Sequence, residues 1–481
     1  MNHRMKYPGI CFLFLTLVAG PAFDAPALGD SRDHRLVIHE WGTFTVLQDE
    51  SGSPIPGVNI NEESLPDFVN VLSPTLSPDT HALGPLFNDR LYQGLPRRSK
   101  GIARFDPAVT MRMETPIVYF HLPEGKPEPR ELDVEIAFRH GWISEWYPDA
   151  DISAPGFVPM RNSQPITSET TGRIAWKGIT VGETGGTPAD TKEHVWLAPR
   201  QVASDPVSTA KGQTERYLFY RGVANMEAPL RVLRSKDGNS LTIVPNASMG
   251  GDIGDMAFPY LWLADIREDG TTAFRVVPGM TLEASNENRA RTTAGRFEKG
   301  DYSRDNLVTL RASMREAAMA DGLYSDEADA LLNTWEVSYF KTSGLRLFFL
   351  VPEAWTESVL PMNVSEPAAM ERVMIGRIEL VTPEQRQLLN RMAAVPAHDK
   401  KWFYEPFERM TTDEQIQTRN DLLSGKRTLE ECGFDTPECY SDYMALGRFR
   451  DALVVDGIRR GRGNGLAMFA QVYGLNYFKS W

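Results

Sequence analysis

The chain has 481 residues, of which 42% are hydrophobic and 24% are charged, and its formal net charge is −13. This length is enough for two or three domains. The acidic balance argues against nucleic acids and anionic membrane surfaces as partners, because both attract a basic protein surface.

The N-terminus has the order of a secretory signal. Arg4 and Lys6 precede an apolar run at residues 10–19, and small residues follow at 21–29. A membrane anchor is the alternative, but the apolar run is shorter than the roughly 20 residues that cross a bilayer. The order therefore predicts a signal peptide over residues 1–29 and export to the periplasm or the cell exterior, with no transmembrane segment left after cleavage.

Short apolar runs separated by turn residues occupy the middle of the chain. Asp237-Gly238 and Asp269-Gly270 lie between such runs and supply the positive φ that tight hairpins need. No helix-length pattern separates the runs, which favours antiparallel strands over βαβ units. We expect a β-sandwich-like domain with long loops over residues 30–285. Its expected strands include residues 36–47, 110–122, 132–140, 173–181, 194–197, 217–220, 230–233, 241–244, 258–264 and 273–277, and residues 64–72 are expected to form a short helix.

The pattern changes after a polar stretch at residues 286–300, which we expect to be a linker. Asp305 is a candidate helix cap, an apolar stripe follows Ser325, and a capping box begins at Thr382. We therefore expect an α-rich region over residues 301–481, with strands near 345–351 and 373–381. The expected helices include residues 305–320, 412–425, 441–461 and 466–473, and the expected fold class is α+β.

Two segments carry the candidate catalytic residues. The first is His39-Glu40, where Glu40 shares a strand face with apolar residues and would be costly to bury unless it is paired. The second runs from His140 to Tyr147 and holds a carboxylate at Glu145. Glu114 is a further candidate for the second carboxylate of an acid/base pair.

Three aromatic residues accompany Glu145, namely Trp142, Trp146 and Tyr147. As an exposed surface they would stack on a sugar. The alternative is an aromatic corner that packs over the edge of a sandwich.

No familiar spacing of ligands indicates a metal or cofactor. The sequence has no HExxH or HxH pattern, so we expect neither a metal site nor a cofactor. Cys432 and Cys439 remain once the signal is removed, and an exported chain meets an oxidising compartment. We therefore expect a disulfide between them, with two free thiols as the alternative.

Four blocks of the sequence resemble a family of bacterial exported proteins. They are HEWGTF at residues 39–44, METPIVYF at 113–120, RYLFYRGVANMEAPL at 216–230 and DALLNTWEVSYFKTSGLRLFFLVPEAW at 329–355. The resemblance spans most of the chain. It implies export and a single architecture, and it assigns no catalytic residue.

Two functions stay open at this stage. The first is an exported binding or structural module that presents the loops of a β-sandwich to a glycan or another extracellular polymer. The second is an exported hydrolase, directed at glycans, with the four titratable candidates named above as its catalytic groups. No motif has the structural context that catalysis requires, so the binding module is the first expectation.

Overall fold

A computed structural model describes residues 35–475, apart from 61–62, 74–85, 87–97, 100–101, 104–105, 124, 126–127, 159–162, 183–184, 247–255, 283–289 and 424. The expected signal peptide lies outside the described residues. No helix of the described ranges has the length and apolar character needed to cross a membrane.

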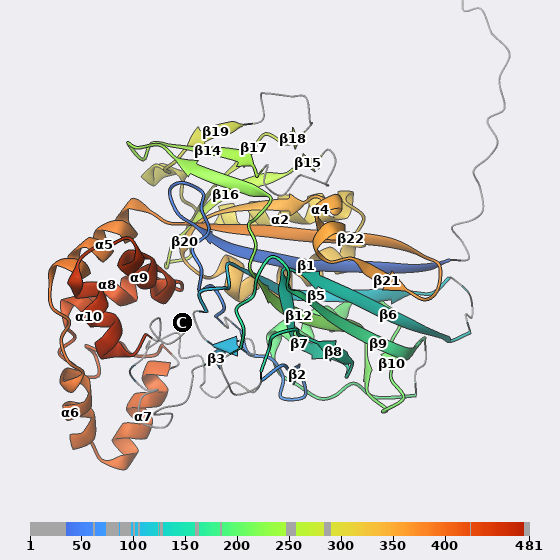
Figure 1. The fold of residues 1–481 in the computed structure, drawn as a ribbon, viewed down its shortest axis with the longest axis horizontal. Coiled ribbons are helices and arrows are strands. Elements are labelled where there is room, and N and C mark those ends of the chain that lie inside the picture. Colours follow the sequence, from blue (N-terminus) through green and yellow to red (C-terminus); the bar gives the residue numbers. More distant parts are fainter. Residues whose placement is uncertain are drawn as a thin grey trace, which may run out of the picture.

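A large sheet runs through the molecule (Figure 1). Its main path has the order β11-β10-β9-β7-β12-β5-β1-β22-β20-β16-β17, and β2, β6, β8 and β21 attach beside that path. The strands are β1 (Leu36–Gln48), β2 (Asn70–Val71), β5 (Met111–His121), β6 (Arg130–Arg139), β7 (Gly141–Tyr147), β8 (Asp151–Ser153), β9 (Thr171–Val181), β10 (Val207–Ser208), β11 (Thr214–Glu215), β12 (Leu218–Ala224), β16 (Leu261–Ile266), β17 (Thr272–Val277), β20 (Gly344–Val351), β21 (Met362–Val364) and β22 (Ala368–Leu380).

The sheet is mixed, because its two longest strands are parallel to each other. β1 pairs in parallel with β22 from Leu36↔Ala368 to Gln48↔Leu380, whereas β5 on its other side is antiparallel. Both strands are buried over most of their length, as expected of central strands covered on both faces. A large and mostly antiparallel sheet is therefore confirmed. The pairing forms one connected sheet, so the expected sandwich is not confirmed.

The two hairpins predicted from Asp-Gly turns are confirmed. Gly238, with φ 74°, joins β13 (Leu230–Arg234) to β14 (Ser240–Pro245), and Gly270, with φ 79°, joins β16 to β17. The hairpins belong to different sheets, however, so the expected antiparallel strands are divided among several sheets. β13, β14 and β19 (Arg291–Ala294) form a small sheet, β15 (Met256–Phe258) pairs with β18 (Met280–Leu282), and β3 (Arg98–Ser99) pairs with β4 (Ile102–Ala103). β19 lies within the stretch expected to be a linker, and there the chain is strand-paired to β14.

The second half of the chain is rich in helices, as predicted, and its two expected strands are β20 and β22. The Thr382 capping box is present: the Thr382 hydroxyl accepts from the Gln385 N–H, and the Gln385 side chain accepts from the Thr382 N–H. The helices are α1 (His194–Leu197), α2 (Asp305–Ala320), α3 (Ser325–Thr334), a π-helix (Glu336–Phe340), α4 (Glu353–Val359), α5 (Pro383–Ala394), α6 (Lys401–Arg409), α7 (Thr412–Leu423), α8 (Glu438–Ala445), α9 (Arg450–Arg459) and α10 (Asn464–Tyr473).

Three local predictions were wrong. The expected helix over residues 441–461 is two helices, α8 and α9, separated by a turn. Residues 194–197 form α1 and not a strand, because an apolar run of four residues has no period that separates the two structures. Residues 64–72 form turns and the short strand β2 instead of a helix. β-Sheet pairing of β2 with β7 decides the local structure there.

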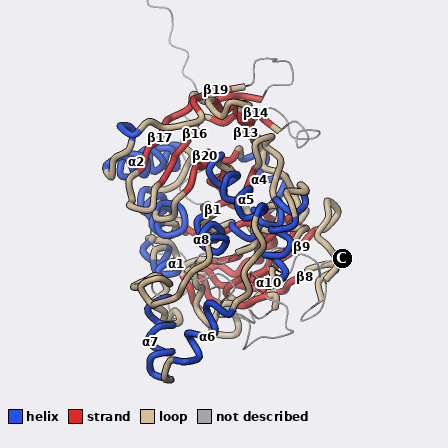
Figure 2. Tube along the Cα trace, turned by 90° about the vertical axis from the view of Figure 1, so that its left-hand side faces the viewer, coloured by secondary structure: helices blue, strands red, loops and turns tan. Residues whose placement is uncertain are grey.

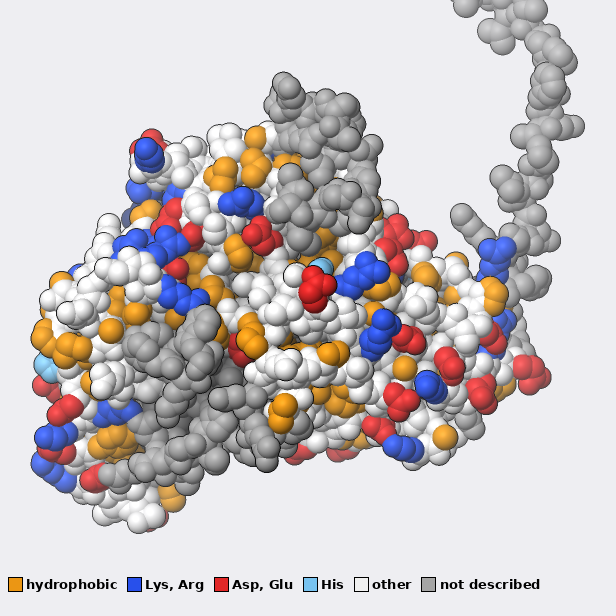
Figure 3. Space-filling view, in the orientation of Figure 1, with side chains coloured by type: hydrophobic (Ala, Val, Ile, Leu, Met, Phe, Trp, Pro, Cys, Tyr) orange, Lys and Arg blue, Asp and Glu red, His pale blue; other side chains and the backbone are white. Residues whose placement is uncertain are grey.

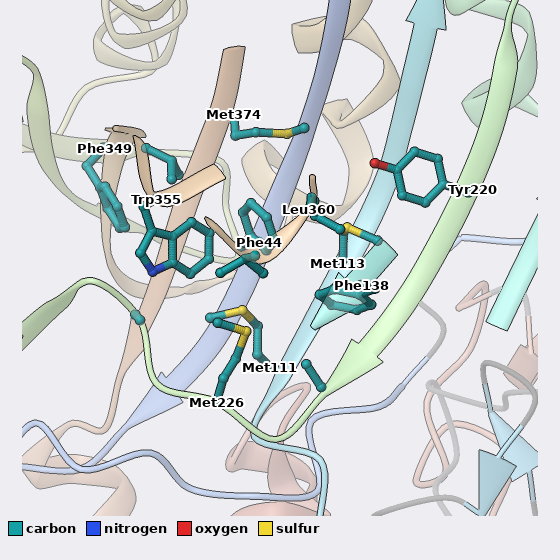
Figure 4. Close-up of a cluster of buried hydrophobic side chains, with 14 of the residues drawn as sticks. Phe44, Met111, Met113, Phe138, Tyr220, Met226, Phe349, Trp355, Leu360 and Met374 are labelled. Atoms are coloured by element: carbon teal, nitrogen blue, oxygen red, sulfur yellow. The ribbon is translucent and has the colours of Figure 1, made fainter. Parts of the chain in front are cut away.

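Three cores hold the elements together. On one face of the sheet, Trp41 and Tyr119 pack with α2, α3 and the π-helix. On the other face, aromatic and thioether side chains such as Phe44, Met113 and Trp355 fill the space beneath β6 and α4 (Figure 4). The third core lies among α5–α10, which gather at one end of the sheet (Figures 1 and 2).

The two cysteines of the α-rich region are free thiols, so the predicted disulfide is wrong for this structure. Cys439 is buried in the first turn of α8 within the helical core, while Cys432 lies half-buried in the turns before that helix. Burial raises the pKa of both thiols. The short spacing in sequence therefore does not bring the two sulfur atoms into a bond.

Candidate functional site

Two histidines and a glutamate meet at one end of the sheet, on the face covered by α3. In the β1–β5 register, Val37 lies opposite His121 and His39 lies opposite Tyr119. Because alternate residues share a face, His39 and His121 are diagonal neighbours on the same side. Glu327 is the third residue of α3 and approaches them from above the sheet.

The three side chains are in hydrogen-bond contact. His39 Nδ1 is 2.6 Å from Glu327 Oε2, and His121 Nε2 is 2.8 Å from Glu327 Oε1. Glu327 Oε2 also accepts from the Tyr324 N–H at 2.8 Å, which closes the first turn of α3. The Glu327 side chain is 0% exposed, that of His39 is 2% exposed and that of His121 is 12% exposed.

Tyr324 lies between this cluster and the solvent. Its ring centroid is 4.5 Å from that of His39 and 4.9 Å from that of His121. The residue itself is 47% exposed. The cluster is therefore shallow, and movement of one side chain at the start of α3 would open it.

Glu327 is ionised at neutral pH. Burial by itself would raise the pKa of its carboxyl group, but hydrogen bonds from His121 and His39 outweigh that cost and lower the pKa to about 2. The ionised carboxylate accepts a hydrogen bond from each imidazole. The same environment raises the pKa of the Tyr324 phenol, through burial first and then the negative charge of Glu327.

The donor set and its spacing suit a divalent metal. One ligand atom from each of His39, His121 and Glu327 lies within 4.8 Å of the other two. Zinc sites place such atoms about 2.0–2.2 Å from the metal, so the atoms lie about 3.3 Å from one another in a tetrahedron. The contacts of Glu327 with His39 and His121, at 2.6 and 2.8 Å, are shorter than that value, so the side chains would have to move apart by on the order of 1 Å to accommodate the ion.

Of the four residues predicted to be catalytic, Glu40 faces away from this cluster. It is 0% exposed, and its Oε2 lies 2.6 Å from Arg372 Nη2, while Tyr220 donates its hydroxyl to Oε1 at 2.6 Å. Burial would lower the pKa of Arg372, but the negative charge of Glu40 outweighs it and raises that pKa. Glu40 is thus half of a buried ion pair that joins β1 to β22.

Glu114 lies on the helix-covered face but belongs to another network. Its Oε1 is 2.9 Å from Arg112 Nε, and its Oε2 accepts from the hydroxyls of Tyr339 at 3.1 Å and Thr45 at 3.2 Å. Arg377 Nη2 lies 3.6 Å from the same oxygen. Glu114 therefore ties the central strands to the π-helix.

His140 and Glu145 do not converge either. His140 occupies the turn between β6 and β7 at φ 64°, where its Nδ1 bonds to the Ser168 carbonyl. Glu145 lies within β7, directly opposite Arg221 of β12. The four predicted catalytic groups consequently occupy different places and form no common site.

The aromatic residues near Glu145 are core residues. Trp142, Trp146 and Tyr147 are 1%, 9% and 3% exposed, so they do not form the exposed sugar-stacking surface that the sequence suggested. Trp142 donates to the Pro155 carbonyl, and Tyr147 packs against Trp196. They form a packed aromatic corner, which was the alternative interpretation of the sequence.

Sequence reasoning singled out His39 but missed His121 and Glu327. The three positions are far apart in the chain and have no fixed ligand spacing. The one available signal is local: Glu327 follows Tyr324 by three residues at the start of an apolar stripe, which is the position of a capping glutamate.

No protein-family model matches the chain, and no curated protein matches it either. The side-chain geometry therefore has to support any functional conclusion.

Proposed function

We propose that this protein binds a divalent transition metal, with zinc as the preferred ion, through His39, His121 and Glu327. The observation that carries the proposal is the convergence of these three ligand atoms from β1, β5 and α3 within 4.8 Å of one another. Imidazole and carboxylate ligands suit zinc among the common divalent ions.

The described residues supply three ligands, and three protein ligands point to a functional centre rather than a purely structural one. Structural zinc sites are closed by four protein ligands, whereas catalytic sites keep one position for water or substrate. Tyr324 stands on the solvent side of the cluster, where that position would open. A zinc ion held by these residues would lower the pKa of a bound water to about 7, so the chemistry that we propose for the centre is hydrolysis.

This proposal differs from the hydrolase outlined from the sequence. That version relied on Glu40, Glu114, His140 and Glu145, which the structure places apart. The export expected from the N-terminal segment is kept as part of the proposal. We also propose that β6 packs over β1 and β5 as the second layer of a sandwich-like arrangement. Its inward side chains share a core with those two strands, and they are Leu132, Val134, Ile136 and Phe138.

The experiment is metal binding by the purified, chelator-treated chain. We expect isothermal titration with Zn²⁺ to give one site per chain, and Co²⁺ to give the visible absorption of a low-symmetry nitrogen–oxygen site. His121→Ala is the preferred variant, because His121 is the most exposed of the three ligands and lies at the end of its strand. It should weaken Zn²⁺ binding by roughly 100-fold or more, beyond the 10–100-fold typical of lost outer-shell partners.

His194→Ala is the matched control. His194 is an exposed histidine whose Nε2 bonds to the Asn333 carbonyl, away from the cluster, so its loss should leave Zn²⁺ affinity unchanged. Circular dichroism of each variant separates lost binding from lost folding. Absence of stoichiometric Zn²⁺ binding by the wild-type chain, or equal affinities in wild type and a folded His121→Ala variant, would end the proposal.

A further inference from the structure

A line of backbone irregularities crosses four neighbouring strands of the main sheet. The β1–β5 register shifts between Trp41 and Thr43, and the β5–β12 register shifts between Phe219 and Gly222. The β12–β7 register shifts between Arg221 and Gly222, which leaves Ser144 as an extra residue in β7. Bulges of this kind re-aim side chains and are common beside functional sites.

Thr115 lies on this line in a conformation that few non-glycine residues adopt. Its φ is 47°, and such strain costs about 1–3 kcal/mol unless the surroundings fix it. Both Nε and Nη2 of the Arg221 guanidinium donate to Thr115 Oγ1 at 3.1 Å. The chain thus holds the Arg221 guanidinium against Thr115.

This arrangement keeps Arg221 from closing onto Glu145. Arg221 Nη1 is 3.7 Å from Glu145 Oε2, which is too long for a hydrogen bond, although both side chains are almost fully buried. Among the described residues, Glu145 Oε2 has no hydrogen-bond partner, and the same is true of the Ser144 hydroxyl. Glu145 is 4% exposed and Ser144 is 0% exposed, so both atoms are buried without a hydrogen bond from the described residues.

We propose that Glu145, Ser144 and Arg221 form a subsite for a hydroxyl group of a small polyol or sugar. An oxygen atom about 2.8 Å from both Glu145 Oε2 and Arg221 Nη1 fits between two atoms that are 3.7 Å apart. The hydroxyl hydrogen is donated to the carboxylate, and the same oxygen accepts from the guanidinium. The Ser144 hydroxyl is available to a second polar atom of the same ligand.

The charges select this ligand class. An anion placed there would be repelled by Glu145, and a cation would be repelled by Arg221. A neutral group that donates and accepts through one atom satisfies both sides, and hydroxyl groups have that property. A water molecule has the same chemistry, so the experiment has to separate a sugar or polyol from water. The subsite does not depend on the metal centre, which uses none of these residues.

The test measures saturable binding of glycerol, xylose, glucose and N-acetylglucosamine by isothermal titration and by thermal shift. We expect at least one of these probes to bind the wild-type chain at millimolar concentration. Ser144→Ala should weaken that binding about 3–10-fold, and Glu145→Gln about 10–100-fold, in line with neutral and charged hydrogen bonds. The unliganded Ser144→Ala variant should melt no lower than wild type, since its hydroxyl has no partner among the described residues.

Thr356→Val is the control for buried hydroxyl removal. Thr356 Oγ1 is also buried without a partner in the described chain, but it lies in α4. This variant should bind the probe like wild type. Polyols also stabilise proteins nonspecifically by exclusion from the surface, and that effect would be equal in all variants. Failure of all four probes to bind saturably, or equal binding by wild type and Ser144→Ala, would overturn the subsite and assign these groups to a buried water.

Discussion

Replacement of Glu40 by Gln tests whether this residue is structural, as its contacts indicate. The carboxylate is fully buried, accepts a hydrogen bond from Arg372 Nε at 2.7 Å and lies 2.6 Å from Arg372 Nη2 in an ion pair. Glutamine keeps the size and an acceptor for the Tyr220 hydroxyl, but it removes the negative charge. Arg372 would then remain buried and charged, with Glu357 as its one remaining carboxylate partner among the described residues and the Leu360 carbonyl as a neutral acceptor.

The magnitude follows from the geometry of the pair. Removing one partner of a buried ion pair costs about 3–5 kcal/mol, because the other charge is left uncompensated. The Glu357 side chain stays 2.6 Å from Arg372 Nη1 but is 41% exposed, so it compensates only part of the charge. We therefore expect Glu40→Gln to lower the free energy of unfolding by about 3 kcal/mol, the lower end of that range.

A double-mutant cycle isolates the pair. Arg372→Met should cost as much as Glu40→Gln, and the double variant should cost less than the sum of the two, with a coupling energy of about 2–3 kcal/mol. The assay is urea unfolding followed by tryptophan fluorescence, with the slope against denaturant compared between variants. A loss below about 0.5 kcal/mol for Glu40→Gln, or additive losses in the cycle, would refute the structural role.

Three further predictions concern packing, pH and the thiols. Gly376→Ala should destabilise the fold by about 1–3 kcal/mol in the same urea assay, because its Cβ would lie 2.1 Å from the ring of Phe349; an unchanged midpoint would contradict this. Burial lowers the pKa of Lys400 to about 8, so between pH ~8 and ~10.5 the unfolded chain binds more protons and wild-type stability should rise with pH. Lys400→Met should remove that rise and add about 1–2 kcal/mol at pH 7, a value reduced for partial exposure; parallel pH profiles of the two proteins would disprove it. Cys432 and Cys439 should both be alkylated in the denatured chain without reductant, and Cys439 should be protected from alkylation in the native state. Detection of a peptide in which the two sulfurs are linked would contradict the assignment of free thiols.

Local chemistry in the sequence was enough to predict several elements. The Asp-Gly turns specify hairpins because glycine adopts positive φ, and the box at Thr382 specifies where a helix begins because its two side chains satisfy free N–H groups. The clean alternation at residues 132–140 likewise predicts β6, which spans Arg130–Arg139. In each instance the determining residues are within a few positions of one another.

The arrangement of these elements depended on contacts without a local signal. Nothing near Leu36 indicates that β1 will pair in parallel with β22, because the two strands are more than 300 residues apart and neither sequence specifies its neighbour. The metal cluster also lacks a local signal in the sequence, because His39, His121 and Glu327 converge only after β1, β5 and α3 have packed. The acidic and basic side chains of the surface do not indicate a site either, because they are interspersed on the face shown in Figure 3.

His39 and Glu40 are adjacent in the sequence but have different roles, so the residue types in this segment could not by themselves predict its function. Side chains alternate across a strand, so His39 points to the face covered by α3 and Glu40 points to the opposite core. His39 therefore joins a shallow cluster beneath an exposed tyrosine, while Glu40 joins a sealed ion pair with Arg372. Substitution of His39 should therefore affect metal affinity, whereas substitution of Glu40 should affect folding stability. Glu40→Gln should lower stability and leave the Zn²⁺ affinity of the folded chain intact, because its carboxylate is on the far side of the sheet from the proposed ligands.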